Sequence, residues 1–173
     1  MRYTSFRMIP IPLQPPACLP RELIASPAFL LGRMGFELKK RAIEEVEEAG
    51  FSLYDYSVMA LLAEGACSTQ ATIADLLNVD RSQLVGLLDG LEERGLVERQ
   101  RDPHDRRRHT VSLTPEGKRQ LAKVRAIVRR VEDEFLAPLA AEDREVLHRL
   151  LVRLASHHDV RFAQTPAAAA AVS

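Results

Sequence analysis

The sequence is poor in cysteine and has no long apolar run, and both shortages exclude classes of protein. Its two cysteines, Cys18 and Cys67, cannot form a disulfide scaffold, and in a reducing compartment such residues are more often inert than reactive. No segment offers the ~18 consecutive apolar residues of a transmembrane helix. Five prolines among the first 20 residues interrupt the apolar stretch that a signal peptide needs. We therefore expect a cytoplasmic protein with no membrane partner.

The chain also lacks a net charge, but its charges are not evenly spread. It contains 24 basic and 24 acidic residues. The segment from Arg99 to His109 nevertheless holds five arginines against two aspartates, whereas the segment from Glu44 to Glu48 is acidic. A clustered basic surface favours nucleic-acid binding more than net charge does. Overall neutrality therefore does not exclude a nucleic-acid partner.

Residues 70–78 predict a short helix that ends at a tight turn. Thr69 can cap its start, and Asn78 suits the left-handed conformation that ends a helix. The apolar positions of this helix are Ile73, Leu76 and Leu77.

A second helix is predicted directly after the turn, over about residues 80–94. Asp80 and Gln83 resemble a capping box at its start, and Gly95 ends it. Apolar residues follow at the spacing of a buried helix face, at Leu84, Leu87, Leu88 and Leu91. The opposite face, which begins in a polar first turn, carries Arg81, Ser82, Gln83, Val85, Gly86 and Asp89. Two helices in this arrangement predict a helix-turn-helix whose second helix enters a major groove.

A hairpin, or wing, is predicted over about residues 96–113. Residues 96–101 and 109–113 alternate like strands, and Asp102 and Pro103 between them supply turn chemistry. The tip carries Arg106, Arg107 and Arg108 in succession. Guanidinium groups on a narrow ribbon suit a minor groove, because its negative potential attracts them.

Together, the helix-turn-helix, the wing and the run from Asp105 to Gly117 resemble the multiple antibiotic resistance regulator (MarR) family of winged-helix transcription factors. The resemblance extends over roughly residues 29–155 and implies a mainly α-helical fold with a small β-wing (α+β). It further implies that Arg107 enters the minor groove while Asp105 orients it. Arg106 and Arg108 would then contact phosphates, and the start of the second helix would contact bases.

Two glycines depart from the pattern of the family. Gly86 and Gly90 lie inside the recognition helix, where each lowers helix stability by about 0.5 to 1 kcal/mol relative to alanine. We interpret Gly86 as a site of close approach to DNA and Gly90 as a site of tight packing. Since neither has a side chain, base contacts are assigned to Arg81, Ser82 and Gln83, with Val85 against a thymine methyl group.

Three further helices favour a homodimer. An early helix begins at Ser26 and Pro27 and ends at Gly50, and another begins at Thr114 and Pro115. The latter carries a coiled-coil-like seam, namely Leu121, Val124, Val128, Val131 and Phe135. The third helix follows that one and carries a second apolar stripe, namely Val146, Leu147, Leu150, Leu151 and Leu154. Packing on their own chain is the alternative, but the resemblance places these helices in an intertwined dimer.

The predicted organisation has five parts. They are a proline-rich arm (1–25), an N-terminal dimerisation helix (26–50), a winged helix-turn-helix lobe (51–113), C-terminal dimerisation helices (114–160) and an alanine-rich tail (161–173). A two-fold dimer implies a pseudo-palindromic operator in double-stranded DNA.

The resemblance also implies an effector site for a small aromatic ligand. Arg33, Tyr54 and Tyr56 fall near the elements that would line it, although a tyrosine pair near a helix start is more often a core feature. Repression relieved by a ligand requires the ligand to prefer the form that does not bind DNA.

Other functions have weaker support in the sequence. No nucleophile motif or metal-ligand spacing is recognisable, so we expect neither an enzyme nor a cofactor. His148, His157 and His158 leave a metal-responsive regulator open, and the cysteines leave a thiol-responsive one open. The two glycines of the recognition helix also leave open a dimeric interaction module that does not bind DNA.

Overall fold

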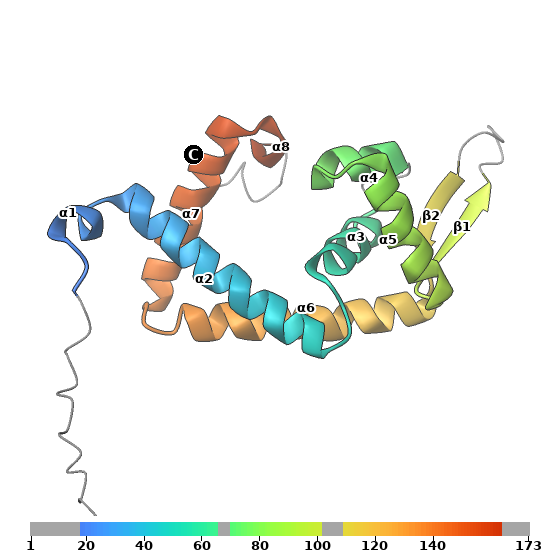
Figure 1. Ribbon diagram of the computed structural model, residues 1–173, viewed down its shortest axis with the longest axis horizontal. Coiled ribbons are helices and arrows are strands. Elements are labelled where there is room, and N and C mark those ends of the chain that lie inside the picture. Colours follow the sequence, from blue (N-terminus) through green and yellow to red (C-terminus); the bar gives the residue numbers. More distant parts are fainter. Residues whose placement is uncertain (1–17, 66–69, 102–108, 164–173) are drawn as a thin grey trace, which may run out of the picture. The chain divides into compact units, whose positions relative to one another are not determined.

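The computed structural model describes residues 18–65, 70–101 and 109–163, and it is mainly helical with one small antiparallel sheet (Figure 1). The expected fold class is confirmed. In chain order the elements are α1 (Arg21–Ile24), α2 (Pro27–Glu48), α3 (Leu53–Ala63), α4 (Gln70–Leu77), α5 (Arg81–Glu93), β1 (Val97–Arg101), β2 (His109–Leu113), α6 (Pro115–Phe135), α7 (Ala141–His158) and α8 (Val160–Ala163).

The chain forms two compact units, Met1–Glu37 and Leu38–Ser173, with the boundary inside α2. In the first unit, the hydroxyl group of Ser26 accepts a hydrogen bond from the backbone N–H of Phe29 at 3.3 Å, which caps the start of α2. Gly50, with φ of +79°, follows the end of the helix. The start and end predicted for the early helix are therefore confirmed.

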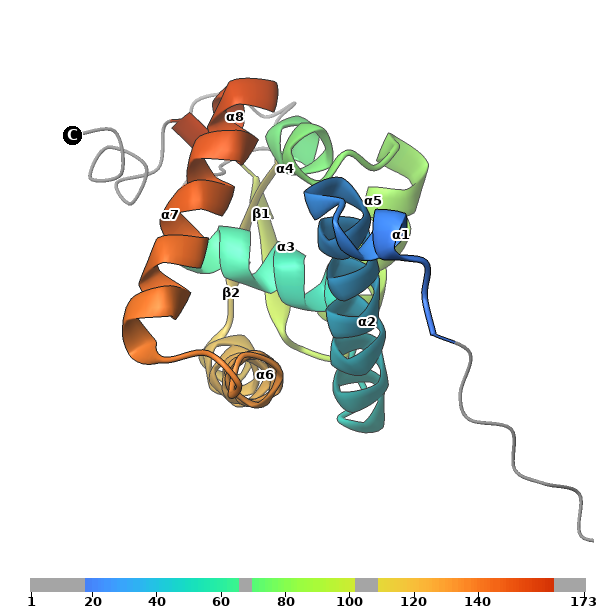
Figure 2. The ribbon, with the colours of Figure 1, turned by 90° about the vertical axis from the view of Figure 1, so that its left-hand side faces the viewer.

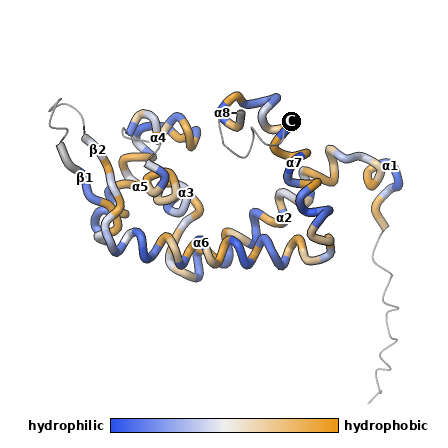
Figure 3. Tube along the Cα trace, turned by 180° about the vertical axis from the view of Figure 1, so that it is seen from behind, coloured by the Kyte–Doolittle hydropathy of each residue, from blue (hydrophilic) through white to orange (hydrophobic). Residues whose placement is uncertain are grey.

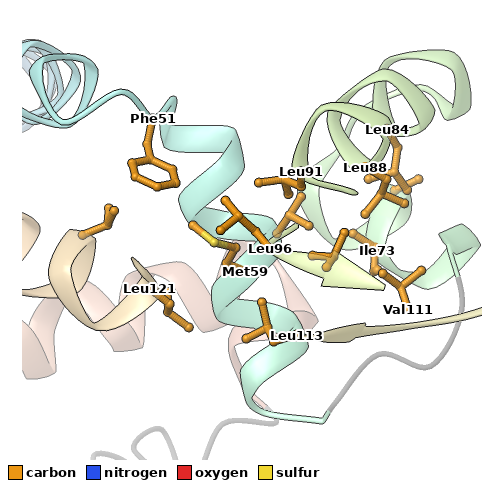
Figure 4. Close-up of a cluster of buried hydrophobic side chains, with 14 of the residues drawn as sticks. Phe51, Met59, Ile73, Leu84, Leu88, Leu91, Leu96, Val111, Leu113 and Leu121 are labelled. Atoms are coloured by element: carbon orange, nitrogen blue, oxygen red, sulfur yellow. The ribbon is translucent and has the colours of Figure 1, made fainter. Parts of the chain in front are cut away.

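The second unit is built around one hydrophobic core (Figure 4). Met59 of α3, Ile73 of α4 and Leu88 of α5 are completely buried in it. The core also takes in Leu84, Leu91, Leu96, Val97, Val111, Leu113, Leu121 and Val124. Because burial of such a side chain stabilises a fold by about 1.5 to 3 kcal/mol, this cluster fixes α5 and the hairpin on α3 and α4.

The helix-turn-helix forms as the sequence predicts. Asn78 adopts φ of +51° after the end of α4, and Asp80 caps α5 by accepting a hydrogen bond from the backbone N–H of Gln83 at 2.7 Å. The short turn between the two helices therefore follows from two local conformational preferences. Thr69, the predicted cap of α4, lies outside the described residues.

The stripe of α6 that the sequence assigns to a dimer seam packs largely within its own chain. Leu121 and Val124 are buried in the core, and Val128 packs against it. Hydrophobic and hydrophilic segments alternate along this helix, as the coloured tube in Figure 3 shows. A heptad-like spacing cannot distinguish a partner helix from the core of the same chain, which is why the expectation is wrong for these residues.

The stripe of α7 is different, because most of it is exposed in the single chain. Leu150 is 52% exposed, and Val146, Leu151 and Leu154 are also exposed. In Figure 2, where α6 is seen end-on, α7 follows it through the turn at residues 136–140. Of the two stripes, only that of α7 leaves a broad apolar surface uncovered in this chain.

Polar contacts join the end of α2 and the C-terminal helices to the rest of the second unit. A guanidinium nitrogen of Arg130 lies 2.7 Å from a carboxylate oxygen of Glu45. Arg161 of α8 donates a hydrogen bond of 2.8 Å to the backbone carbonyl of Asp75 in α4. Arg161 is also paired with the carboxylate of Asp159. Through its bond to Asp75, α8 contacts α4, the first helix of the helix-turn-helix.

The start of α6 is packed directly against the backbone that leads into β1. A Cβ atom added to Gly117 would lie 1.9 Å from the carbonyl oxygen of Leu96. Glycine is therefore required at this position for its lack of a side chain, which gives a physical reason for the glycine that ends the run from Asp105 to Gly117.

We predict opposite effects for two glycine substitutions. Gly117→Ala should lower the free energy of unfolding by about 1 to 3 kcal/mol, because the added methyl group meets backbone atoms that cannot turn away. Gly90→Ala should raise the free energy of unfolding by about 0.5 to 1 kcal/mol, because alanine has a higher helix propensity than glycine and its methyl group would meet no neighbouring atom. Urea unfolding of both variants measures the difference. Equal stability of Gly117→Ala and the wild-type protein would contradict the close approach.

Candidate nucleic-acid interface

The recognition helix α5 has one buried and one exposed face. Leu84, Leu88 and Leu91 lie in the core, whereas Val85 is 42% exposed. The structure brings all the predicted base-contacting residues to the exposed surface at the start of α5, namely Arg81, Ser82, Gln83, Val85 and Gly86. Their positions follow from the helical period, because burial of a leucine at every third or fourth position leaves the polar residues of the first turn in solvent.

The first turn of α5 is organised around the carboxylate of Asp80. The hydroxyl group of Ser82 donates a hydrogen bond of 2.6 Å to Oδ1 of Asp80, and the backbone N–H of Gln83 donates to the same oxygen. The Ser82 hydroxyl, followed by the Gln83 N–H, holds the pKa of Asp80 below its ordinary value. Ser82 therefore supports the helix cap, and its hydroxyl proton is already engaged.

The two glycines of α5 have open surroundings. No atom of the described residues, beyond the local backbone, lies within 4 Å of a Cβ atom built on Gly86 or on Gly90. The interpretation of Gly90 as a site of tight packing is therefore wrong. Gly86 is exposed on the same surface as Gln83 and Val85.

The hairpin forms as predicted, with β1 and β2 antiparallel. Val97 pairs with Leu113, Arg99 with Val111, and Arg101 with His109. On the outer face, the hydroxyl group of Ser112 donates a hydrogen bond of 3.1 Å to Glu98. The tip lies outside the described residues, so the roles of Asp105, Arg106, Arg107 and Arg108 stay predictions.

Two arginines that the sequence analysis did not select hold the far end of α5. Arg94, just after the helix, donates a hydrogen bond of 3.0 Å to the carbonyl of Gly50 and lies 4.2 Å from the ring centre of Phe51. Nη2 of Arg99 in β1 donates a hydrogen bond of 2.5 Å to Oδ1 of Asp89. Asp89, which the sequence places near the DNA-facing side, is therefore paired with the hairpin.

The three predicted effector residues have different surroundings. Tyr54 is 46% exposed, whereas Tyr56 packs against the core. Arg33 belongs to the first unit, where it lines a shallow pocket with Phe29 and Phe36. A larger groove of about 650 Å³ lies between the second half of α2, the end of α6 and α7, and none of the three residues lines it. Their role as a ligand site stays a prediction.

Other candidate sites are not assembled in the described part of the chain. There, no group of three histidine, cysteine, aspartate or glutamate side chains is placed to hold a metal ion. His157 and His158 stack edge to face, with ring centres 5.1 Å apart. Nor does any described helix combine the length and the apolar character that a bilayer crossing demands.

A helix-turn-helix followed directly by an antiparallel hairpin defines a winged-helix protein. The sequence profile of the MarR family matches residues 53–108, which include α3, α4, α5 and β1 and end just before β2. A regulatory protein assigned to the hcr operon of Thauera aromatica is 31% identical over 72% of this chain and 80% of its own. Transcriptional regulator HosA of Escherichia coli O111:H- is 34% identical over 57% of this chain and 73% of HosA. The chain belongs to the MarR family.

Solved structures agree with this assignment. The transcriptional repressor CouR, in a structure bound to a 23-mer DNA duplex, is 31% identical, with a TM-score of 0.69 over 80% of this chain and 99% of CouR. CouR from Rhodococcus jostii RHA1, in a structure bound to p-coumaroyl-CoA, is 32% identical, with a TM-score of 0.66 over 79% of this chain and 94% of CouR. The protein is thus a transcriptional regulator and not an enzyme.

The pKa of Asp80 leads to a prediction about pH. Because that pKa is lowered in the folded protein, the charged carboxylate stabilises the fold above its unfolded pKa, and this contribution is lost as the pH falls through the folded value. Asp80→Asn keeps an acceptor at the cap but cannot ionise. Between about pH 5 and about pH 3, its melting temperature should therefore fall less than that of the wild-type protein. Parallel pH profiles of the two proteins would contradict the role of the charged cap.

Proposed function

We propose that this regulator binds double-stranded DNA as a homodimer, with the start of α5 in the major groove and the tip of the wing in the adjacent minor groove. The observation that carries the proposal is the exposed first turn of α5. The opposite face of this helix is buried, and Asp89 in its second half is joined to the hairpin. The DNA-bound structure of CouR supports it, because CouR shares this fold over nearly its whole length.

The contacts divide into two kinds by their chemistry. Arg81, Ser82, Gln83 and Val85, with the backbone at Gly86, contact base edges, while Arg107, oriented by Asp105, enters the minor groove. Arg106 and Arg108 contact phosphates and contribute affinity that does not depend on sequence. The engaged hydroxyl of Ser82 limits that residue to accepting a hydrogen bond unless the cap rearranges.

The homodimer is supported by the exposed apolar stripe of α7. Four large side chains of that stripe, from Val146 to Leu154, are more than a third exposed in the single chain, and burial against a second copy would remove them from water. A two-fold dimer presents its recognition helices about 34 Å apart, which matches about 10 base pairs of DNA. The proposed operator is accordingly a pseudo-palindrome.

We further propose that the protein is a repressor that a small aromatic ligand releases from DNA. The support is by analogy with CouR, a repressor solved in complex with p-coumaroyl-CoA. Arg33, Tyr54 and Tyr56 are the candidate ligand contacts. Such a ligand acts only if it prefers the form of the dimer that does not fit the operator.

The test of DNA binding is fluorescence anisotropy on the DNA upstream of the gene and on a scrambled duplex, across a series of salt concentrations. We expect tighter binding to the upstream DNA, with log affinity falling steeply as log salt concentration rises, because phosphate contacts release counterions. Equal and weak binding to both duplexes would overturn specific recognition of this site and favour an interaction module.

The two neighbouring arginines of the wing should differ in effect. Arg107→Ala should weaken binding to the operator by about 1 to 3 kcal/mol and change binding to scrambled DNA less. Arg106→Ala should weaken both similarly and reduce the salt slope by about one. Since the two variants remove the same charge from adjacent positions, each is the control for the other. Identical profiles would contradict the division of roles.

A further inference from the structure

Arg99 occupies a position in the hairpin that the strand pattern reserves for apolar residues. Val97 and Arg99 are two residues apart in β1 and therefore point to the same face of the sheet. Their partners across the hairpin are Leu113 and Val111, and all three apolar residues are at most 8% exposed. An arginine on this inner face is unexpected from its neighbours, so its surroundings must compensate its charge.

The compensation comes from the recognition helix. Nη2 of Arg99 lies 2.5 Å from Oδ1 of Asp89, and Nη1 lies 3.5 Å from Oε2 of Glu92. Asp89 and Glu92 are three residues apart in α5 and so lie on one face of the helix. One guanidinium group thus bridges two carboxylates of α5 from the adjoining strand.

The burial of Arg99 distinguishes this bridge from an ion pair in which both members are exposed. The side chain of Arg99 is 22% exposed, and its Nε atom is buried without a hydrogen-bond partner among the described residues. The side chains of Asp89 and Glu92 are 48% and 42% exposed, so the buried end of the bridge is the guanidinium group. Fully exposed ion pairs contribute little to stability, whereas a mostly buried guanidinium group depends on its carboxylate partners for compensation of its charge. The planar guanidinium group also fixes both contacts in one geometry, which the single ammonium group of a lysine cannot do.

We propose that Arg99 is a positioning residue that locks the wing to the recognition helix, so that both meet DNA as one rigid unit. This inference rests on the proposed DNA binding. Arg99 has no part in contacting DNA itself. It acts through Asp89 and Glu92, which hold β1 at a fixed place along α5, and displacement by about 1 Å is enough to disturb paired contacts.

The bridge has a second effect that must be separated from positioning. An unpaired Asp89 would place a negative charge on the helix that approaches DNA phosphates, and Arg99 neutralises that charge. If neutralisation were its whole role, removal of the Asp89 charge would restore DNA binding to an Arg99 variant. If positioning is its role, binding stays weak in the double variant.

The experiment combines hydrogen exchange of the backbone amides in β1 and β2 with DNA anisotropy for Arg99→Ala, Arg99→Lys, Asp89→Asn and the double variant Arg99→Ala/Asp89→Asn. The matched control is Lys40→Ala, which removes a positive charge from an exposed ion pair with Glu44 on α2. Melting temperatures establish that each variant is folded.

For Arg99→Ala we expect hairpin amides to exchange about tenfold faster and operator affinity to fall about tenfold, with a smaller loss for scrambled DNA and an unchanged salt slope. Arg99→Lys should fall between the wild-type protein and Arg99→Ala. The double variant should remain weak. Lys40→Ala should match the wild-type protein in both measurements.

Three outcomes would overturn the proposal. Unchanged hairpin exchange in Arg99→Ala would show that there is no lock, whether or not the protein binds DNA. Faster exchange with full operator affinity would show a lock without consequence for recognition, and full rescue by Asp89→Asn would assign Arg99 to charge neutralisation. Failure of the wild-type protein to bind any duplex is distinct, because it refutes the proposed function while the exchange data still report on the lock.

Discussion

The carbonyl group of Leu96 is the point at which the recognition helix, the hairpin and α6 meet. It accepts hydrogen bonds from the backbone N–H of Thr114 at 3.1 Å and from the Thr114 hydroxyl group at 3.3 Å. The amide of Leu96 donates in turn to the carbonyl of Leu91, near the end of α5. Because Gly117 has no side chain, the first turn of α6 can approach this carbonyl directly. The rest of the winged helix depends on this close approach, since it sets where α6 begins relative to α5.

The same junction determines how α5 is presented. Its start is fixed by the Asp80 cap and its middle by three buried leucines. Its far end is held by Arg94, which contacts the turn after α2, and by Arg99, which contacts the helix from the hairpin. The exposed side chains of the first turn are thus presented to solvent by a helix whose backbone is held from several sides. A rigid helix with a free polar turn is the arrangement that base contacts require.

Much of this arrangement could be predicted from local sequence signals. Asn78, Asp80 and Gly95 each mark a helix boundary through backbone conformation or capping, and those signals do not depend on the rest of the fold. The alternation of the hairpin strands similarly predicted their limits to within one residue. Family resemblance added the division between base and phosphate contacts, which local signals cannot supply.

The remaining features depend on contacts between distant parts of the chain. The α6 stripe has the same spacing whether it meets a partner or its own core, so Leu121 and Val124 could not be placed from their spacing. From the sequence, Gly90 is interpreted as a site of tight packing, but its surroundings are open. How closely a residue is packed depends on the tertiary structure and not on its neighbours in the sequence. The inward position of Arg99 was the one signal available in the sequence, since it interrupts an apolar alternation, and its partners on α5 became evident only in the structure.

The central claim is that α5 enters the major groove from a dimer with two-fold symmetry. Hydroxyl-radical footprinting of the wild-type protein on the upstream DNA tests it most directly, because the cleavage pattern reports which sugars the protein covers. The account predicts two related protected regions on one side of the duplex, with centres about 10 base pairs apart, each flanked by minor-groove protection from a wing. A single protected region without symmetry, or uniform cleavage at protein concentrations that saturate binding, would contradict it.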